Sequence, residues 1–261
     1  MEIIGYTSAV LIGISLGLIG GGGSILTVPV LVYLFGLDAF LAAEYSLFIV
    51  GISSAAGSLA YLKNGQVDLK TAVVFGIPSI ISIFLTRIYI VPLIPAEVLR
   101  AGDFALTRNT FLLLIFAVLM IVASYKMIRK NKNENTAVIK ENIILAAGEG
   151  ALIGVLTGLV GAGGGFMIIP ALVGLLKIPM KTAVGTSLVI ISLNSLIGFS
   201  SSVGNTVIEW KFLISIAGIA VIGIIIGSYF SGKIDGKKLK PAFGWFIMVM
   251  GVYIIFKEIF F

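Results

Sequence analysis

Long runs of hydrophobic residues, with few polar positions inside them, dominate the chain. The segments 110–124 and 213–229 are two such runs. With their flanks they approach the ~20 residues that a helix needs to cross the hydrocarbon of a bilayer. A membrane β-barrel needs apolar and polar residues that alternate in segments of about 10 residues, and these runs show no alternation. The pattern therefore predicts an all-α integral membrane protein.

Composition supports this prediction and narrows the chemistry. Hydrophobic residues make up 59% of the chain, charged residues 11%, and the mean hydropathy is +1.15, whereas about a quarter of a soluble domain is charged. The 261 residues include no Cys and no His, which excludes thiolate and imidazole chemistry and the usual soft metal ligands. We therefore expect no catalytic residues, no metal site and no cofactor.

Two glycine-rich segments indicate an internal duplication. "GLIGGGGSILTVP" (17–29) and "GLVGAGGGFMIIP" (158–170) align at a constant shift of 141 residues, and 17 of the 54 positions between Gly17 and Lys70 are identical to their partners at that shift. We interpret residues 1–128 as a first membrane repeat, 129–140 as a cytoplasmic linker and 141–261 as a second membrane repeat.

Charge predicts the topology of these repeats. The linker and the loop 232–240 are the most basic loops, so both are expected in the cytoplasm rather than on a nucleic acid. The spans 181–203 and 212–231 already return the chain to its starting side, so segment 142–176 must be a helical hairpin bent at its glycines. Segment 1–34, which lacks a basic signal-peptide start and should remain in the mature protein, is then a hairpin with outward ends.

The fold prediction is thus two inverted repeats of about five helical segments each, with both termini outside. An odd number of segments in each half makes the halves inverted. The alternative is one kinked span for each glycine segment, which gives four spans in each half and parallel repeats.

The glycine runs place flexible backbone at membrane depth, where only protein or a water-filled cavity can satisfy its polar groups. A short helix should begin after each run, near Ser24 and Gly165, and its first N–H groups and its dipole attract anions. Ser24 should either cap its helix or donate to a ligand. Close helix packing is the alternative reason for glycines in membranes, and we favour it for Gly223 and Gly227. Neither run continues into the Gly-Lys-Ser/Thr of a P-loop.

Three motifs carry a family resemblance. The duplicated G-x-x-G-x-G-G-G/S-x4-P, "AVGTSL" at 183–188 and "GIIIGSYFSGKID" at 223–235 resemble the TauE/SafE sulfite exporter family, also called the toluene-sulfonate uptake permease family. The resemblance covers nearly the whole chain. It implies a permease of a bacterial or archaeal plasma membrane for sulfite, organosulfonates or other sulfur-containing anions, coupled to an ion gradient.

The predicted substrate site combines the family motifs with polar residues expected inside the spans. Asn194 lies mid-span and should either donate to the anion or bridge helices, and Ser53 holds the equivalent position in the first half. Glu44 and Ser46 stand where Gly185 and Ser187 stand in the second half, so the two halves differ in chemistry. The predicted substrate-binding residues are Gly20, Gly21, Gly22, Gly23, Ser24, Gly161, Gly163, Gly164, Gly165, Thr186, Ser187, Asn194, Ser46 and Ser53.

Two carboxylates are the coupling candidates. Glu149 falls one or two turns inside the second hairpin, where a carboxylate is costly and usually functional, and Glu44 opens the second span. A proton-coupled mechanism would use one of them as a titrating group; the alternative for Glu149 is exposure to a cytoplasmic vestibule. Arg87, near the end of a span, would either steer anions or snorkel to the interface.

We therefore predict a secondary transporter that moves a small inorganic or organic sulfur oxoanion by alternating access between the inverted halves. The expected coupling ion is H⁺ or Na⁺, and the lipid bilayer is the surrounding partner. An anion or cation channel is the nearest alternative, and a membrane enzyme or assembly scaffold is the third.

Overall fold

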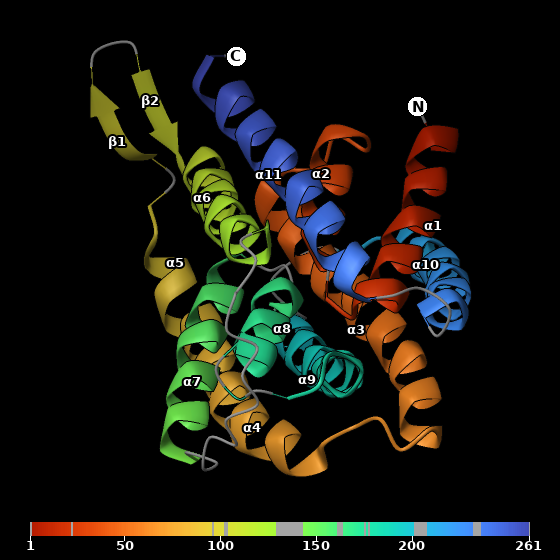
Figure 1. The fold of residues 1–261 in the computed structure, drawn as a ribbon. Coiled ribbons are helices and arrows are strands. Elements are labelled where there is room, and N and C mark those ends of the chain that lie inside the picture. The colour runs from red at the N-terminus through yellow and green to blue at the C-terminus, as the bar shows by residue number, and fades with distance from the viewer. Residues whose placement is uncertain are drawn as a thin grey trace.

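The protein is a bundle of tilted helices with a small β-hairpin at one end (Figure 1). The computed structural model describes residues 2–21, 23–95, 97–101, 104–128, 143–160, 164–174, 176, 178–200, 208–231 and 236–260. The predicted linker 129–140 lies outside these ranges.

The helices occur in two series of the same order. The first series is α1 (Glu2–Ile19), α2 (Ser24–Tyr33), α3 (Ala39–Lys63), α4 (Leu69–Leu85) and α6 (Arg108–Ile128), and the second is α7 (Ile143–Val160), α8 (Gly165–Gly174), α9 (Met180–Ser200), α10 (Trp210–Ser231) and α11 (Gly236–Phe260). After α4 come a π-helical turn, η1 (Thr86–Ile90), the short α5 (Val91–Leu93), and the antiparallel strands β1 (Glu97–Ala101) and β2 (Phe104–Thr107). The sequence analysis did not predict this hairpin.

Side-chain caps fix where two of the long helices begin. Asp38 accepts hydrogen bonds from Phe40 N and Leu41 N at the start of α3, at 2.7 and 3.2 Å. Asp68 accepts from Thr71 N at 3.1 Å at the start of α4. Each carboxylate satisfies backbone donors that have no partner within the helix.

Two of the helices that are long and apolar enough to span a bilayer form the centre of the bundle. Within the described residues the four such helices are Ala39–Lys63, Leu69–Leu93, Met180–Ser200 and Trp210–Ser231. The apolar windows of α3 and α9 are 67% and 72% buried, against 33% and 39% for α4 and α10. On α4, the exposed side chains of Val73, Ile77 and Ile81 follow one face, as expected of a lipid-facing surface.

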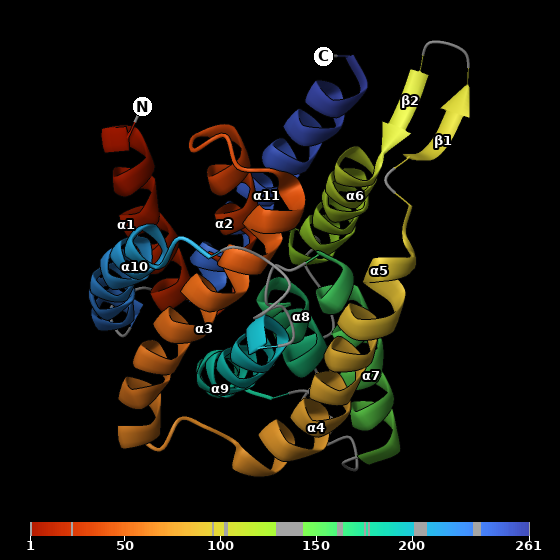
Figure 2. The ribbon, with the colours of Figure 1, turned by 180° about the vertical axis from the view of Figure 1, so that it is seen from behind.

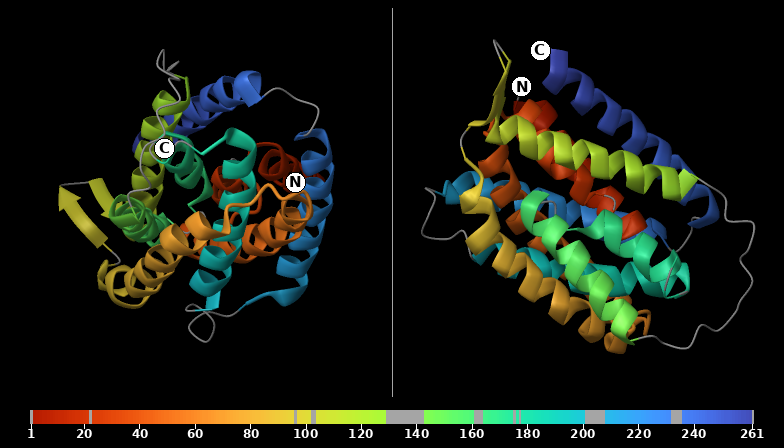
Figure 3. Two further views of the ribbon diagram at one scale, coloured as in Figure 1. Left: turned by 60° about the horizontal axis from the view of Figure 1, so that its bottom comes forward. Right: turned by 90° about the vertical axis from the view of Figure 1, so that its left-hand side faces the viewer.

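Helix contacts follow the same pattern in the two series. Helix α1 packs on α10, and the equivalent helix α7 packs on α4; these two pairs flank α3, α8 and α9 in Figures 1 and 2. Helices α3 and α9 are antiparallel. Gly51 lies against Leu196, and Gly57, further along α3, lies against the earlier residue Leu188 of α9. Helices α6 and α11 lie side by side in Figure 3. Exchanging the two series therefore preserves the main helix contacts, namely α1–α10 with α7–α4 and α3–α10 with α9–α4.

Each glycine segment is a hairpin rather than a kinked span. Rings of Tyr6, near the start of α1, and Phe35, just after α2, have centroids 6.0 Å apart, so both ends of the first segment reach the same face. In the second segment, Ile153 of α7 shares a buried cluster with Ile168 and Leu172 of α8. The predicted Gly-broken hairpins are confirmed.

Small residues let the outer helix pairs approach closely. A Cβ on Gly223 would lie 3.0 Å from Gly13 Cα, and one on Gly227 would lie 3.0 Å from Ile14 Cα. On the other side, Gly154 of α7 lies against the backbone of Ser79 in α4. The packing interpretation of Gly223 and Gly227 is therefore correct.

The two ends of the bundle serve as reference faces. The N-terminal end of α1 and the C-terminal end of α11 lie together at one end, which we call the terminal face (Figure 1). The C-terminal end of α6 and the start of α7 lie at the opposite end, which we call the linker face (Figure 3).

Candidate substrate site

The first glycine run ends α1 and turns the chain beside α9. Gly20 has φ +77°, a left-handed conformation that favours glycine, and its N–H donates to Leu16 O at 2.7 Å. A Cβ on Gly20 would lie 2.7 Å from Val184 Cγ1 and 3.1 Å from Ser187 Oγ, both on α9. Conformation and space therefore both require glycine at this position.

Helix α2 begins at Ser24, where the sequence predicted a helix start. Its N-cap residue is Gly23, and no side chain caps it. Ser24 Oγ donates to Gly21 O at 2.7 Å, so the hydroxyl spans the break and is committed within the protein. Leu26 N–H donates to Gly23 O at 3.1 Å. The amides of Ser24 and Ile25 therefore precede the first backbone hydrogen bond of the helix.

The second break repeats this arrangement with a different neighbour. Gly164 has φ +67°, and a Cβ there would collide with Thr157 Oγ1 on α7. Helix α8 begins at Gly165, and Met167 N–H donates to Gly164 O at 2.9 Å. The Thr157 hydroxyl is buried and has no hydrogen-bond partner among the described residues. The repeat shift places Leu16 at the equivalent position of α1, so this polar group belongs to one break only.

The two breaks touch each other at the centre of the bundle. A Cβ on Gly165 would lie 2.8 Å from Gly21 Cα and 3.2 Å from Gly21 O, and it would also meet Ile191 of α9. Backbone therefore contacts backbone, and no larger residue fits at either position. The contact brings the starts of α2 and α8 together, two helix N-termini with partial positive charge.

Three predicted hydroxyl groups on α3 and α9 differ in their hydrogen bonding. Ser187 Oγ contacts Gly20 O at 3.2 Å and Val184 O at 2.8 Å, so it contacts the first break directly. Ser53 Oγ donates to Ile49 O of its own helix at 2.6 Å. Ser46 Oγ is fully buried and has no hydrogen-bond partner within the described part of the chain.

Asn194 bridges two helices through one side of its amide. Nδ2 donates to Ser79 Oγ of α4 at 2.7 Å, which is one of the two roles that the sequence left open. Its Oδ1, and the buried hydroxyls of Ser54 and Ser195, have no partner among the described residues. Buried polar atoms are nearly always hydrogen-bonded in folded proteins. These atoms place unsatisfied polar groups in the buried core of α3 and α9.

Thr186 holds a loop through a contact that the two halves share. Asp68 N–H donates to Thr186 Oγ1 at 2.8 Å. At the positions related by the repeat shift, Glu209 N–H donates to Tyr45 OH, also at 2.8 Å. Each hydroxyl fixes the loop that precedes the next long helix of the other half. The structure thus gives Thr186 a structural role, and its predicted contact with substrate stays a prediction.

Glu44 and Arg87 form a buried ion pair between α3 and η1. Arg87 Nη1 lies 4.0 Å from Glu44 Oε1, and the side chains are only 6% and 4% exposed. The π-helical turn that carries Arg87 is a type of irregularity often found at functional sites. The sequence offered snorkelling or anion steering for Arg87; its guanidinium is instead buried and paired.

Glu149 lies away from the glycine breaks. It is half-buried on α7, with a buried Oε2. Eleven residues separate it from Val160 at the end of α7, which corresponds to about 16 Å at ~1.5 Å per residue. Glu149 is therefore near the linker face, and any role in coupling would act at a distance from the glycine breaks.

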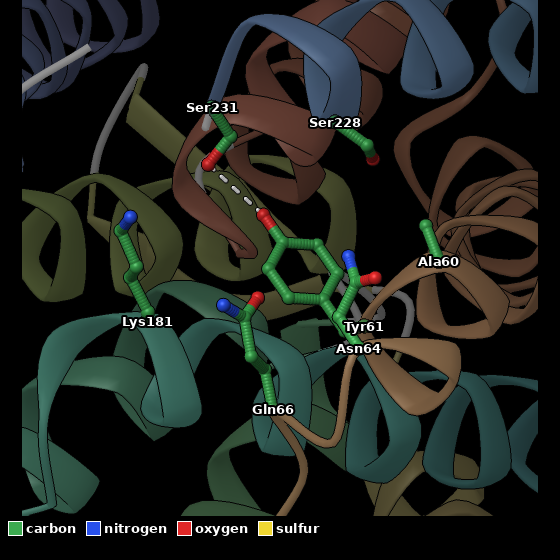
Figure 4. Close-up of a pocket in the computed structure, with 7 residues that line it drawn as sticks. All are labelled: Ala60, Tyr61, Asn64, Gln66, Lys181, Ser228 and Ser231. Atoms are coloured by element: carbon green, nitrogen blue, oxygen red, sulfur yellow. Dashed lines mark hydrogen bonds between the residues drawn. The ribbon is translucent and has the colours of Figure 1, made fainter. Parts of the chain in front are cut away.

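A cavity of about 120 Å³ opens near the linker face between α3, α9 and α10. We call it the linker-face cavity. Tyr61 OH lies 3.0 Å from Ser231 Oγ and 3.2 Å from Gly17 O. The dashed line in Figure 4 marks the contact with Ser231. Ser231 Oγ also donates to Leu18 O at 3.3 Å. The cavity therefore ends against the last turn of α1, directly before Gly20. Besides Ala60, the side chains around it are Tyr61, Asn64, Gln66, Lys181, Ser228 and Ser231.

Comparison with known proteins identifies the family. The sequence profile described as "Sulfite exporter TauE/SafE" matches residues 6–254. The chain belongs to this family. The resemblance inferred from the duplicated glycine motif is therefore confirmed.

Curated relatives of this TauE/SafE chain carry transporter names. A probable membrane transporter protein of Xylella fastidiosa (strain Temecula1) is 27% identical over 263 residues, covering 98% of this chain and 95% of the relative. The probable membrane transporter protein YunE of Bacillus subtilis is 26% identical, covering 93% of both chains. A probable membrane transporter protein of Methanocaldococcus jannaschii is 28% identical, covering 97% of this chain and 93% of the relative. No solved structure gives a significant match.

The structure brings part of the predicted site of this TauE/SafE chain together. Gly20, Gly21, Gly165 and Ser187 meet at the paired breaks, while Gly22, Gly161 and Gly163 lie outside the described residues. The sequence analysis missed Thr157. Its signal is a polar residue within "GVLTGLVGAGGG", about two turns before the glycines.

Gly20→Ala is the sharpest test of the first break, and Gly36→Ala is its matched control. Both glycines have positive φ, +77° and +70°, but a Cβ on Gly36 meets nothing within 4 Å. Each alanine should cost about 1 kcal/mol or slightly more in backbone strain. Only Gly20→Ala should also weaken anion binding, because its methyl group would press on Val184 and Ser187. Thermal unfolding and anion titration of the purified variants measure the two effects. Wild-type affinity in Gly20→Ala would mean that this glycine serves packing alone.

Arg87→Met should destabilise the protein by about 3–5 kcal/mol, because it leaves the buried Glu44 carboxylate without its arginine. The double variant Glu44→Gln/Arg87→Met should recover most of that loss. Thermal unfolding followed by tryptophan fluorescence completes the double-mutant cycle, with the exposed Lys63→Met on α3 as control. Additive losses in the double variant would show that the two side chains are not coupled.

Proposed function

We propose that this chain is a secondary transporter of a small sulfur-containing oxoanion, such as sulfite or an organosulfonate. The observation that carries the proposal is the contact between Gly21 and Gly165, which joins two helix N-termini at the centre of the bundle. Amides at such termini bind anions through their unpaired N–H groups and the helix dipole. Transport changes no covalent bond, so the proposal requires no acid–base cluster and no cofactor.

The proposed mechanism is alternating access between two inverted halves. Two observations support it. The main helix contacts of one series recur in the other, and the equivalent helices α3 and α9 are antiparallel. Equivalent helices that run in opposite directions are what an inverted repeat requires. The two halves can then rock about the paired breaks and expose them first to one face and then to the other.

A transporter fits the described geometry better than a channel does. A channel needs a continuous path, and the buried Glu44–Arg87 pair lies between α3 and η1. The linker-face cavity lies toward the far end of α3. A buried ion pair toward one end and a cavity toward the other support an alternating-access cycle, in which one side opens at a time.

The proposed orientation places the linker face in the cytoplasm and the terminal face outside, in a bacterial or archaeal plasma membrane. The basic linker supports it through the positive-inside rule. Because the chain has no cysteine, single cysteines introduced at positions 2 and 132 can be labelled in sealed cells with an impermeant thiol reagent. We expect labelling from outside at position 2 only. Labelling of both positions from one side would disprove the orientation.

Glu149 and Glu44 are the proposed coupling residues, with H⁺ or Na⁺ as the coupling ion. Glu149 is near the linker face, and Glu44 is paired with Arg87. Glu149→Gln mimics only the protonated state of that carboxylate. It should abolish pH-driven accumulation and leave exchange of substrate partly intact.

Flux into proteoliposomes tests the function and the coupling together. Radiolabelled sulfite, sulfate, thiosulfate, taurine and sulfoacetate are offered with and without an imposed pH or Na⁺ gradient. We expect saturable, gradient-driven accumulation of at least one of these anions, and stimulation by unlabelled substrate inside. Flux that never saturates and follows voltage alone would favour a channel, and no flux of any anion would contradict the proposed substrate class. Unchanged pH-driven transport in Glu149→Gln would remove Glu149 from the mechanism.

A further inference from the structure

The two halves differ at the two pairs of equivalent positions that carry the buried ion pair of the first half. The repeat shift pairs Glu44 with Gly185 and Arg87 with Ser228. In the first half the two long side chains meet and fill the region between their helices. In the second half Gly185 packs against Gln66 and Tyr61, and Ser228, which stands in the place of Arg87, lines the linker-face cavity.

The groups around this cavity suit an anion. Lys181 supplies a positive charge, and the amides of Asn64 and Gln66 supply neutral donors; Figure 4 shows the two amides next to Tyr61, and Lys181 on the neighbouring helix. None of the described lining residues is acidic. Ser228 Oγ is buried and has no hydrogen-bond partner among the described residues. A buried hydroxyl without a partner is costly, and it could donate a hydrogen bond to an anion or to the water that hydrates it.

The size of the cavity limits what can bind. A volume of about 120 Å³ is several times that required by one water molecule, so a compact oxoanion can enter. An organic tail of several carbons would have to extend out of the cavity. The size of the cavity therefore favours a small, tetrahedral or pyramidal oxoanion over a large sulfonate.

We propose that the linker-face cavity is an anion-binding site in its own right, separate from the paired glycine breaks. Tyr61 stands between the two sites, because its hydroxyl contacts both Ser231 in the cavity and Gly17 just before the first break. If the chain is a transporter, the cavity is a waiting site on the transport path, and this role rests on the proposed function. Anion binding in the cavity does not depend on that function.

A cysteine reporter in the cavity tests this proposal directly. Ala60→Cys lines the cavity, while Leu62→Cys is exposed on the same helix without lining it. The purified full-length variants are labelled with the neutral reagent N-ethylmaleimide, in sodium sulfate or in sodium gluconate of equal ionic strength. Sulfate should slow labelling at position 60 several-fold and leave labelling at position 62 unchanged.

Second substitutions show which groups hold the sulfate. Lys181→Gln in the Ala60→Cys background should weaken the apparent sulfate affinity about tenfold or more, since a hydrogen bond to a charged group contributes about that factor. Ser228→Ala should weaken it by a smaller factor. The control is Lys63→Gln. It removes an equal charge at the end of α3 that is near the cavity, but Lys63 does not line the cavity, so the sulfate affinity should stay unchanged.

The Gly20→Ala background separates the cavity from the glycine breaks. Sulfate protection of position 60 should persist in Gly20→Ala even where flux is lost. Protection that disappears in Gly20→Ala but survives Lys181→Gln would assign the signal to the breaks and overturn the proposal, as would equal effects of Lys181→Gln and Lys63→Gln. Intact cavity protection in a protein that carries no oxoanion flux would instead refute the transport function alone.

Discussion

Backbone that leaves the helical conformation cannot face lipid, because its N–H and C=O groups would lose their hydrogen bonds. This chain interrupts its helices twice at the depth of the bundle centre, and the rest of the architecture provides for those two interruptions. Helices α3 and α9 enclose them, Ser187 contacts the carbonyl of Gly20, and the Ser24 hydroxyl spans the first break. The outer pairs α1–α10 and α4–α7 then separate this polar centre from the bilayer.

Glycine serves two different needs in this molecule. At Gly20 and Gly164 the need is conformational, because both positions have a left-handed backbone. At Gly223 and Gly227 the backbone is helical and the need is space for the facing helix α1. The contact of Gly21 with Gly165 is a third arrangement, in which space is needed for another break rather than for a helix.

The sequence predicted the features that repeat locally and missed those that depend on distant contacts. The hairpins followed from charge and from the number of spans, and the packing role of Gly223 and Gly227 followed from their spacing. The Glu44–Arg87 pair could not be predicted, because 43 residues separate the partners and nothing in either local pattern specifies the other. The bond between Thr186 and the loop before α4, the β-hairpin and the linker-face cavity likewise depend on how separate segments meet.

The Glu44–Arg87 pair has an energetic consequence for a molecule built from two equivalent halves. If the halves were identical, exchanging their conformations would regenerate the same molecule, and the two access states would be equally populated without a membrane potential or substrate. In the proposed alternating-access cycle, an ion pair present in one half alone removes that degeneracy, and a state that kept the pair would differ in free energy from one that broke it. Populations follow that difference exponentially. One buried pair can therefore set the side to which an empty carrier is open for most of its time.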